Sequence, residues 1–473
     1  MRIFSFFNQP TQNISLSAAI LALSTLLSAL LGIWRDRLLA SSFGAGRTLD
    51  IYVASFRIPD LVYNLLVAGV LAVAVLPVFA EAFQKDKEKA WRVINNFFNL
   101  FLLTLLVTCF IFFLLTPWLI KFVVPGFDIA EIQQTIWLTR LLFLSSIFFG
   151  GVGLFSGLLQ YFNKFIVLAL SPLIYNLFII LGILFLSPRF GIFGVGLGVV
   201  LGAFVYFCLQ LYSCVSCGWH WQRILDWKDP GIKRVFRLML PRFFSAASQQ
   251  INLLITTGIA STLGLGALAI FYFSNNLQSF VTSFVGVSLA TAAFQALSKA
   301  AAREDRSGLL SNLSLTFRKI LFWSLFLSFF LIVFKEPIVR ILLGSGKFSP
   351  EAIQLTAAAL GLFSVSIFAQ AEIPLLLRAF FALQEAVRPT VIAVVSMLAN
   401  ILLSFGLVQW LTVDPRPREI LSSFLGNLNP EALGFALLGL PLAFSLATIF
   451  QFGLLCYFLR DKFKLLDSHE SRI

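Results

Sequence analysis

The sequence predicts an all-α polytopic membrane protein, with twelve transmembrane helices in two pseudo-symmetric six-helix lobes. Of its 473 residues, 59% are hydrophobic and only 12% are charged, and its mean hydropathy is +0.91. A soluble domain is about half apolar and about a quarter charged. Apolar runs of about 20 residues recur along the whole chain, and each can cross a bilayer core as a helix. No run alternates apolar and polar residues, which disfavours a transmembrane β-barrel.

The predicted spans begin with the apolar run at residues 14–34. This run lacks a small-residue cleavage pattern and is longer than the apolar core of a signal peptide, so we expect it to be retained. The twelve predicted helices centre near residues 24, 71, 106, 148, 175, 202, 250, 284, 326, 364, 400 and 446. The five cysteines lie in or beside these spans, so a disulfide framework is not expected.

The lysine and arginine residues predict the orientation of the spans. With the N-terminus inside, most of them fall in inner connections, above all at 85–92, 218–237 and 299–319. Because cytoplasmic loops carry the excess of positive charge, both termini are predicted to be cytoplasmic. The net charge of +13 follows mostly from these loops, which face anionic lipid headgroups, and a nucleic-acid partner is therefore not expected.

The two halves of the chain resemble each other weakly. FGAG (43–46) and LGLG (263–266) each lead into a polar-spotted helix that is followed by a charged inner loop. A second similarity between the halves is an asparagine within an apolar, odd-numbered span, Asn176 in the first half and Asn400 in the second. Paired six-helix lobes around a central path are a transporter architecture. We expect an N-terminal lobe at 1–217, a cytoplasmic linker at 218–237, a C-terminal lobe at 238–460 and a cytoplasmic tail at 461–473.

The segment RDRLLASSFGAGRTLDIYVASFRIPD (35–60) departs from the charge pattern of the other outer loops. It carries four arginines and three aspartates between the first two apolar runs. Ionisable groups at membrane depth are costly and usually face the interior of a bundle or a hydrated cavity. We therefore expect Arg35, Asp36 and Arg57 to point into a central cavity. The alternative is that the arginines snorkel to the outer headgroups, or pair with neighbouring aspartates as a packing clamp.

Polar residues inside the spans are few, and none of them forms an enzyme constellation. The chain has two histidines, no carboxylate pair within a span, and no P-loop, H-E-x-x-H or nucleophile-elbow motif. Asn64 lies in the second predicted span and Glu372 in the tenth. Asn275, Asn276 and Gln278 cluster in the eighth, where cavity lining and interhelical hydrogen bonding, worth about 1 kcal/mol each, are equally good explanations.

The charged segment and its flanks resemble one transporter family. The family pattern is matched by Ser28, Gly32, Arg35, Asp36, FGAG at 43–46, Asp50, Phe56-Arg57-Ile58-Pro59 and Pro77. Weaker matches follow at VVPGF (123–127), LSPLIYN (170–176), LGSGKF (343–348) and RAFFALQEAVRPTV (378–391). On these residues the chain resembles the MurJ (MviN) lipid II flippases of the MOP transporter superfamily, and the resemblance covers nearly its whole length.

The resemblance implies a V-shaped central cavity between the two lobes. Basic residues in it would hold the diphosphate of the lipid-linked precursor, because a guanidinium matches phosphate oxygens bidentately. The candidate substrate-binding residues are Arg35, Asp36, Asp50, Arg57, Asp60, Asn64, Asn275 and Asn276. Arg37 and Arg47 are expected to be rim charges. Some members hold sodium between helices 7, 11 and 12, which makes Asn400 a candidate sodium ligand.

The chain also departs from the family pattern. Ala29 and Tyr63 stand where the family has arginines, and Asn275-Asn276 replaces an Asp-Arg pair. Because opposite charges are missing together, a compensated network has been lost. Ser404 stands where a carboxylate of the sodium site would be expected. The family commonly has fourteen spans, so with twelve the lipid tail must follow another route or lie open to the bilayer.

The predicted function is transport of lipid II from the inner to the outer leaflet of the bacterial cytoplasmic membrane by alternating access. No cofactor is expected, and energy would come from a coupling ion, sodium or proton, or from the membrane potential. Expected partners are the undecaprenyl-diphosphate-linked substrate and membrane lipids, for a monomer near the cell-wall synthases. The alternatives are a flippase for another polyprenyl-diphosphate oligosaccharide, a multidrug exporter, and a non-transporting scaffold of cell-wall synthesis.

Overall fold

A computed structural model of the chain describes residues 14–66, 79–229, 247–303, 305–385, 387–426, 429 and 434–470. All regular structure in these residues is helical, which confirms the predicted all-α class. The chain divides into two compact units. The first comprises Met1–Phe43 and Arg47–Leu254, and the second comprises Gly44–Gly46 and Ile255–Ile473. The predicted second span near residue 71 and the end of the predicted linker at 230–237 lie outside the described residues.

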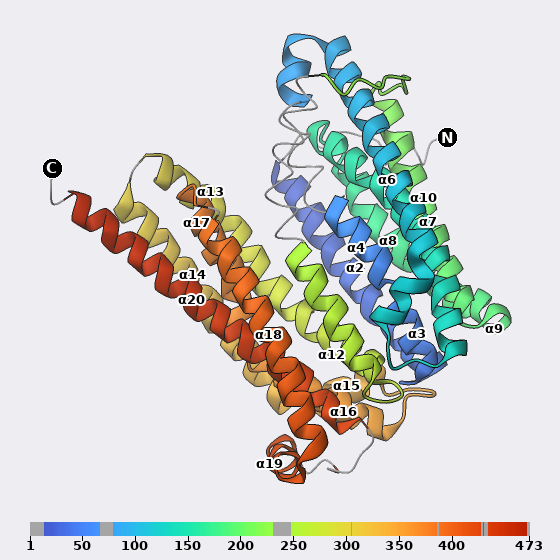
Figure 1. The fold of residues 1–473 in the computed structure, drawn as a ribbon. Coiled ribbons are helices and arrows are strands. Elements are labelled where there is room, and N and C mark those ends of the chain that lie inside the picture. Colours follow the sequence, from blue (N-terminus) through green and yellow to red (C-terminus); the bar gives the residue numbers. More distant parts are fainter. Residues whose placement is uncertain are drawn as a thin grey trace. The chain divides into compact units, whose positions relative to one another are not determined.

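The described part of the first unit is a bundle of long helices with several short helical segments (Figure 1). Its elements are α2 (Ile14–Phe43), α3 (Arg47–Ser55), α4 (Arg57–Leu66), α6 (Lys87–Val123), α7 (Ile129–Tyr161), α8 (Phe165–Leu181), the π-helical η1 (Gly182–Leu186), α9 (Ser187–Phe190) and α10 (Ile192–Ser216). Helix α7 packs against α3, α4, α6 and α10, while α8 packs against α2 and α10. The core of this unit is therefore built around α7 and α8.

Local sequence signals begin two of these helices. Asp86 precedes α6, and its carboxylate accepts hydrogen bonds from the backbone N–H groups of Glu88 and Lys89 at 2.9 and 3.2 Å. Asp128 precedes α7 and forms a reciprocal capping box with Glu131, with both bonds at 2.8 Å. These side chains satisfy N–H groups that have no partner within the helix, and so determine where each helix starts.

Small residues let α8, η1 and α10 approach closely. A Cβ at Gly198 of α10 would lie 2.8 Å from the Cα atom of Gly182, the first residue of η1. A Cβ at Gly202 would lie 3.0 Å from the carbonyl oxygen of Tyr175 on α8. In lipid there is little hydrophobic drive between helices, so close backbone packing over small residues is a principal source of their association.

An extended segment at 219–226 lies along α6 and is held by a row of asparagines. Asn95 donates to the carbonyl oxygen of His220 at 2.9 Å. Asn96 both accepts from the backbone N–H of Asp226 at 2.7 Å and donates to its carbonyl oxygen at 2.8 Å. One turn later, Asn99 donates to the carbonyl oxygen of Gln222 at 2.7 Å. The amides replace the backbone partners that this non-helical segment lacks.

The second unit contains most of the remaining helices. Its elements are α12 (Ala267–Thr282), the π-helical η2 (Ser283–Val287), α13 (Ser288–Ala302), α14 (Arg306–Val333), α15 (Lys335–Leu343), α16 (Pro350–Ser364), α17 (Ile367–Ala382), α18 (Val387–Val413), α19 (Pro415–Leu425), the 3₁₀ turn η3 (Phe435–Leu438) and α20 (Gly439–Glu470). The chain at 247–261 is also helical. Helix α17 packs against α13, α14 and α20, and α18 packs against α20.

Glycines of the two related motifs, FGAG (43–46) and LGLG (263–266), lie close to other backbone segments within the second unit. Gly44 adopts a φ of +68°, a conformation that favours glycine, and a Cβ there would lie 2.6 Å from the carbonyl oxygen of Lys347. Gly266 adopts a φ of +79°, and a Cβ there would overlap the backbone of Ala45. FGAG and LGLG are therefore glycine-rich because backbone approaches backbone at these positions.

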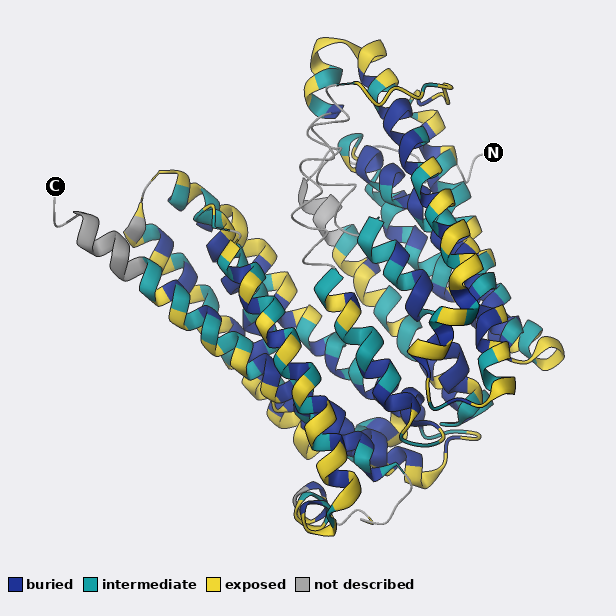
Figure 2. Ribbon diagram, in the orientation of Figure 1, coloured by how far each residue is buried: buried dark blue, intermediate teal, exposed yellow. Residues whose placement is uncertain are grey.

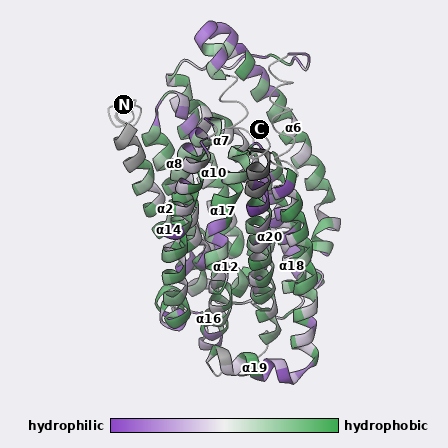
Figure 3. Ribbon diagram, turned by 90° about the vertical axis from the view of Figure 1, so that its left-hand side faces the viewer, coloured by the Kyte–Doolittle hydropathy of each residue, from purple (hydrophilic) through white to green (hydrophobic). Residues whose placement is uncertain are grey.

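Eight described helices are long and apolar enough to cross a membrane, or nine if α16 and α17, bent by 45°, form one span. The predicted count of twelve remains a prediction. Their outer surfaces are apolar: Phe322 and Phe329 of α14 are 64% and 68% exposed. Figure 2 shows exposed residues along the long helices of each unit, and Figure 3 shows that these helices are mostly hydrophobic, whereas α19 is among the more hydrophilic segments. Exposed apolar side chains of this kind suit contact with lipid.

Candidate functional site

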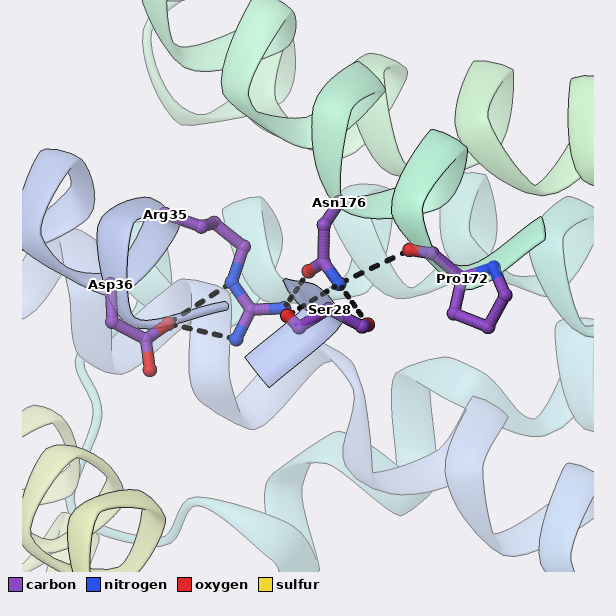
Figure 4. A network of polar contacts seen from close by, with 5 residues as sticks. All are labelled: Ser28, Arg35, Asp36, Pro172 and Asn176. Carbon is purple, nitrogen blue, oxygen red and sulfur yellow. Dashed lines mark hydrogen bonds and ion pairs between the residues drawn. The ribbon is translucent and has the colours of Figure 1, made fainter. Parts of the chain in front are cut away.

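Arg35 lies in a hydrogen-bond network that joins α2 to α8 (Figure 4). Its Nε and Nη2 atoms donate to Oδ1 of Asp36 at 3.0 and 2.8 Å, and its Nη1 donates to Oδ1 of Asn176 at 3.1 Å. Asn176 in turn donates from Nδ2 to the hydroxyl of Ser28 and to the carbonyl oxygen of Pro172, both at 3.2 Å. Partners on two helices therefore hold the guanidinium in one orientation.

Burial makes this network electrostatically strong. The side chains of Arg35 and Asp36 are 18% and 11% exposed, so their charges neutralise each other where water screens them weakly. Arg37, two residues later on the same helix, is exposed. The structure thus separates two arginines that are close in sequence, and places Arg35 among polar groups of the first unit. A held guanidinium of this kind can bind an oxyanion through parallel N–H bonds.

Helix α4 carries three of the predicted site residues along one face. Arg57, Asp60 and Asn64 follow at helical spacing, and Arg57 is 8% exposed. Arg57 and Asp60 interact electrostatically, one turn apart. Asn64 donates from Nδ2 to the backbone carbonyl of Asp60 at 2.8 Å. The hydroxyl of Ser146 on α7 donates to the carbonyl oxygen of Pro59 at 3.3 Å, which anchors this face to the core.

Asp50 belongs to an ion network at the start of α7. Its Oδ2 lies 3.7 Å from Nη1 of Arg47, and its side chain is 1% exposed. Arg47 donates from Nε to Oε1 of Glu131 at 2.8 Å, and its guanidinium carbon lies 4.6 Å from the ring centre of Phe127. This network ties α3 to the capping box of α7. Arg47, expected at the rim, is 20% exposed, while the predicted role of Asp50 in substrate binding remains a prediction.

An aromatic cluster includes Tyr63, the residue that stands where the family pattern has arginine. The ring centres of Tyr63 and Phe149 are 5.7 Å apart, edge to face. Phe149 also packs against Tyr175 at 5.1 Å and Tyr206 at 5.8 Å. Edge-to-face pairs are favourable aromatic arrangements. Rings from four helices therefore meet at this position, and it carries no cationic charge.

The polar cluster of α12 is bonded within its own helix. Nε2 of Gln278 donates to Oδ1 of Asn275 at 3.1 Å and to the hydroxyl of Ser279 at 3.4 Å. Gln278 is buried, and its Oε1 atom has no hydrogen-bond partner among the described residues. Asn275 and Asn276 are half-buried. The cluster lies in the second unit, whereas the Arg35 network lies in the first.

Asn400 lies on α18 in a row of neutral polar residues. Ser396, Asn400 and Ser404 follow at intervals of four residues and are all buried. This row offers one amide and two hydroxyl groups, and no carboxylate, to a cation. No group of three or more His, Cys, Asp or Glu side chains that could hold a metal ion occurs in the described part of the chain. The row lacks the carboxylate that such a site would be expected to have, and Asn400 as a sodium ligand remains a prediction.

The pairings of two residues at the site emerge only from the structure. Asn176 stood out in the sequence as a buried-type asparagine, but its hydrogen bond to Arg35 spans 141 residues. Glu131 pairs with Arg47 across 84 residues, and its only local signal is the D-x-x-E spacing of the capping box. Neither pairing follows from residue type, because each depends on how two helices pack.

Comparison with known proteins places this geometry in a family. The family model described as "Lipid II flippase MurJ" matches residues 39–415. A protein named lipid II flippase MurJ from Burkholderia cenocepacia is 28% identical over 401 residues, which cover 80% of this chain and 76% of that protein. Residues 39–415 include α3, α4 and every described helix from α6 to α18, together with the predicted site residues from Asp50 to Asn400. Arg35 and Asp36 lie just before the matched range.

Solved structures share the fold. A structure of lipid II flippase MurJ in an inward closed conformation superposes with a TM-score of 0.77 at 21% identity, covering 93% of this chain and 87% of that one. An inward-facing multidrug resistance MATE transporter of the MOP superfamily gives a TM-score of 0.71 at 15% identity, covering 92% of this chain and 96% of that one. The chain therefore has the MOP transporter fold, is a multi-pass membrane protein, and belongs to the MurJ family of lipid II flippases.

Proposed function

We propose that this protein carries lipid II from the inner to the outer leaflet of the bacterial cytoplasmic membrane by alternating access. The observation that carries the proposal is the Arg35 network, an oriented and largely buried guanidinium in a chain of this family. Guanidinium groups bind phosphate oxygens through two parallel N–H bonds, which suits the diphosphate of a polyprenyl-linked precursor. The lipid tail stays in the bilayer while the headgroup crosses.

Asp36 stabilises the site when no substrate is bound. A lone guanidinium at membrane depth is costly, and Asp36 neutralises it through two N–H bonds. When a diphosphate arrives, its oxygens take the place of the Asp36 carboxylate, and Asn176 keeps the third N–H bond of Arg35 in position. Loaded and empty sites thus both offer Arg35 an anionic partner. Alternating access needs this property, because the transporter must also return without its substrate.

The proposal includes the orientation of the protein in the membrane and the source of energy for transport. Both termini lie in the cytoplasm, which the distribution of lysine and arginine supports. The protein works as a monomer near the cell-wall synthases and performs no covalent chemistry on its substrate. Energy comes from an ion gradient or from the membrane potential, because the chain carries no nucleotide-binding motif of its own.

Complementation in cells depleted of their own lipid II flippase tests the proposal. Arg35→Ala is expected to abolish growth support while the protein remains in the membrane at its normal level. Arg37→Ala is the matched control, since this arginine is exposed on the same helix, and it is expected to support growth. Native mass spectrometry should find lipid II bound to the wild-type protein and lost from Arg35→Ala. A scaffold without transport activity would tolerate both changes.

The aromatic cluster at Tyr63 favours one second candidate, a flippase for another polyprenyl-diphosphate oligosaccharide. Rings replace a cationic side chain there, so fewer positive charges are available to a headgroup. Competition between lipid II and a polyprenyl diphosphate that carries a different saccharide, read by native mass spectrometry, separates the two candidates. Preference for lipid II supports the first.

A further inference from the structure

Helix α17 of the second unit carries a buried carboxylate without a partner. Glu372 is 0% exposed, and neither of its carboxylate oxygens has a hydrogen-bond partner among the described residues. Its neighbours on the same helix, Ala371, Leu375 and Leu376, belong to the apolar core of this unit. An ionised carboxylate in apolar surroundings loses its hydration without compensation, whereas the neutral acid loses far less.

The other polar groups near the bend between α16 and α17 are paired with one another. Gln370 donates from Nε2 to the hydroxyl of Ser366 at 2.9 Å, and that hydroxyl lies 2.9 Å from the hydroxyl of Ser445 on α20. Ser445 donates to the carbonyl oxygen of Leu362 at 2.8 Å. This network holds the bend without including Glu372.

The backbone beside Glu372 is irregular on both sides of the contact. Helices α16 and α17 meet at 45°, and Pro374 removes one N–H group from the hydrogen-bond ladder of α17. Opposite α17, the π-helical η2 brings Gly286 so close that a Cβ there would lie 2.6 Å from the Cα atom of Ala371. Discontinuous helices form the substrate and ion sites of many transporters, and π-helical turns are frequent at functional sites of proteins.

Among their described side chains, the elements packed against α17 bring no counter-charge to Glu372. They are α12, α13, α14, α20 and η2. Their charged residues with described side chains, together with that of α17, are Lys299, Arg318, Lys319, Arg378, Arg460, Asp461 and Lys462. None of these forms an ion pair with Glu372, and Arg378 instead donates to the hydroxyl of Thr291 at 2.7 Å. Cys456 of α20 is the titratable side chain that interacts with it electrostatically.

We propose that Glu372 is a proton-binding site whose protonation is coupled to transport, an inference that rests on the proposed function. In the buried arrangement described here the carboxyl group is the neutral acid. When the bent span rearranges and admits water, the O–H bond breaks, the proton passes to water, and the carboxylate remains hydrated. Because the carboxylate resists return to the apolar core, re-burial requires a proton to be taken up from water again. A metal ion needs several oxygen ligands, and Glu372 offers one carboxylate.

Infrared difference spectroscopy of the purified full chain tests proton binding independently of transport. The wild-type protein is expected to show the C=O stretch of a protonated carboxylic acid at neutral pH, and Glu372→Gln is expected to lose that band. Glu351→Gln, at an exposed position of α16, is the matched control and should retain it. A wild-type spectrum without the band, or a band that Glu372→Gln retains, overturns the proposal.

Transport in proteoliposomes tests the coupling. An imposed pH gradient should accelerate lipid II movement by the wild type and by Glu351→Gln, and Glu372→Gln should lose this acceleration while still binding lipid II in native mass spectrometry. Equal acceleration in Glu372→Gln overturns the coupling. If the wild type shows the acid band but binds no lipid II, the proton site stands and the proposed substrate is wrong.

Discussion

Arg35 donates a hydrogen bond from Nη1 to Oδ1 of Asn176 at 3.1 Å, and this bond joins the first long helix of the chain to α8. Asn176 also bonds to Ser28 on the helix that carries Arg35. A single asparagine thus orients the guanidinium and crosslinks two helices. If Arg35 holds the diphosphate of the substrate, then Asn176 acts through it as a positioning residue.

Asn176→Ala is expected to weaken lipid II binding while the protein still inserts and folds. An interhelical hydrogen bond in a membrane is worth about 1 kcal/mol, so the loss of stability should be small. The measurement is native mass spectrometry on the single variants Asn176→Ala and Arg35→Lys and on the double variant Arg35→Lys/Asn176→Ala. Because Asn176 acts through Arg35, their effects should not add. Asn312→Ala is the control, since Asn312 bonds to a carbonyl of its own helix, and additive effects would contradict a positioning role.

Arg35→Lys keeps the positive charge and removes the fork of N–H donors. Lysine cannot bond to Asp36 through two atoms and reach Asn176 as well. Lipid II affinity is therefore expected to fall by roughly tenfold or more, since one hydrogen bond to a charged group is worth about 1.5–3 kcal/mol. Arg37→Lys should bind as the wild type does. Full binding by Arg35→Lys would show that charge alone suffices.

Arg47→Ala is expected to lower stability rather than to affect the substrate directly. It removes the guanidinium that lies beside the buried Asp50 carboxylate and that donates from Nε to Glu131. Breaking a buried ion pair costs about 3–5 kcal/mol, so the melting temperature of the purified protein should fall clearly. Asp50→Asn in the Arg47→Ala background removes the buried negative charge that has lost this cation, and should recover part of the loss. An unchanged melting temperature together with lost lipid II binding would instead place this network in the substrate site.

Asn96→Ala is expected to release the extended segment from α6. The side-chain amide of Asn96 donates from Nδ2 to the carbonyl oxygen of Asp226 and accepts at Oδ1 from its backbone N–H, so the variant loses a donor and an acceptor at once. Hydrogen exchange at the Asp226 amide should become faster than in the wild type. Exchange of the amides within α6 should remain as slow as in the wild type. Asn312→Ala again serves as the control. Unchanged exchange at Asp226 would mean that other contacts of 219–226 hold this segment.

Much of the fold could be predicted from local patterns. Apolar runs and the absence of period-two alternation are properties of short segments, and they predicted the helical, membrane-spanning class correctly. The orientation predicted from the charged residues remains a prediction. The residues Arg35 and Asp36 also stood out from sequence, because charge is rare in apolar spans and each instance demands a reason. The number of spans is harder to predict, since bent and broken helices such as α16 and α17 blur their limits.

The sequence by itself determined the membrane-spanning helical class and marked a few charged residues at its first helices, because the free energy of placing polar groups in lipid acts on each segment separately. Only the tertiary structure decided which partners those residues have. It pairs Arg35 with Asn176 and Arg47 with Glu131, and it leaves Glu372 without a partner in an apolar core. These outcomes depend on which faces of distant helices pack together, and such long-range contacts have no signature within either segment.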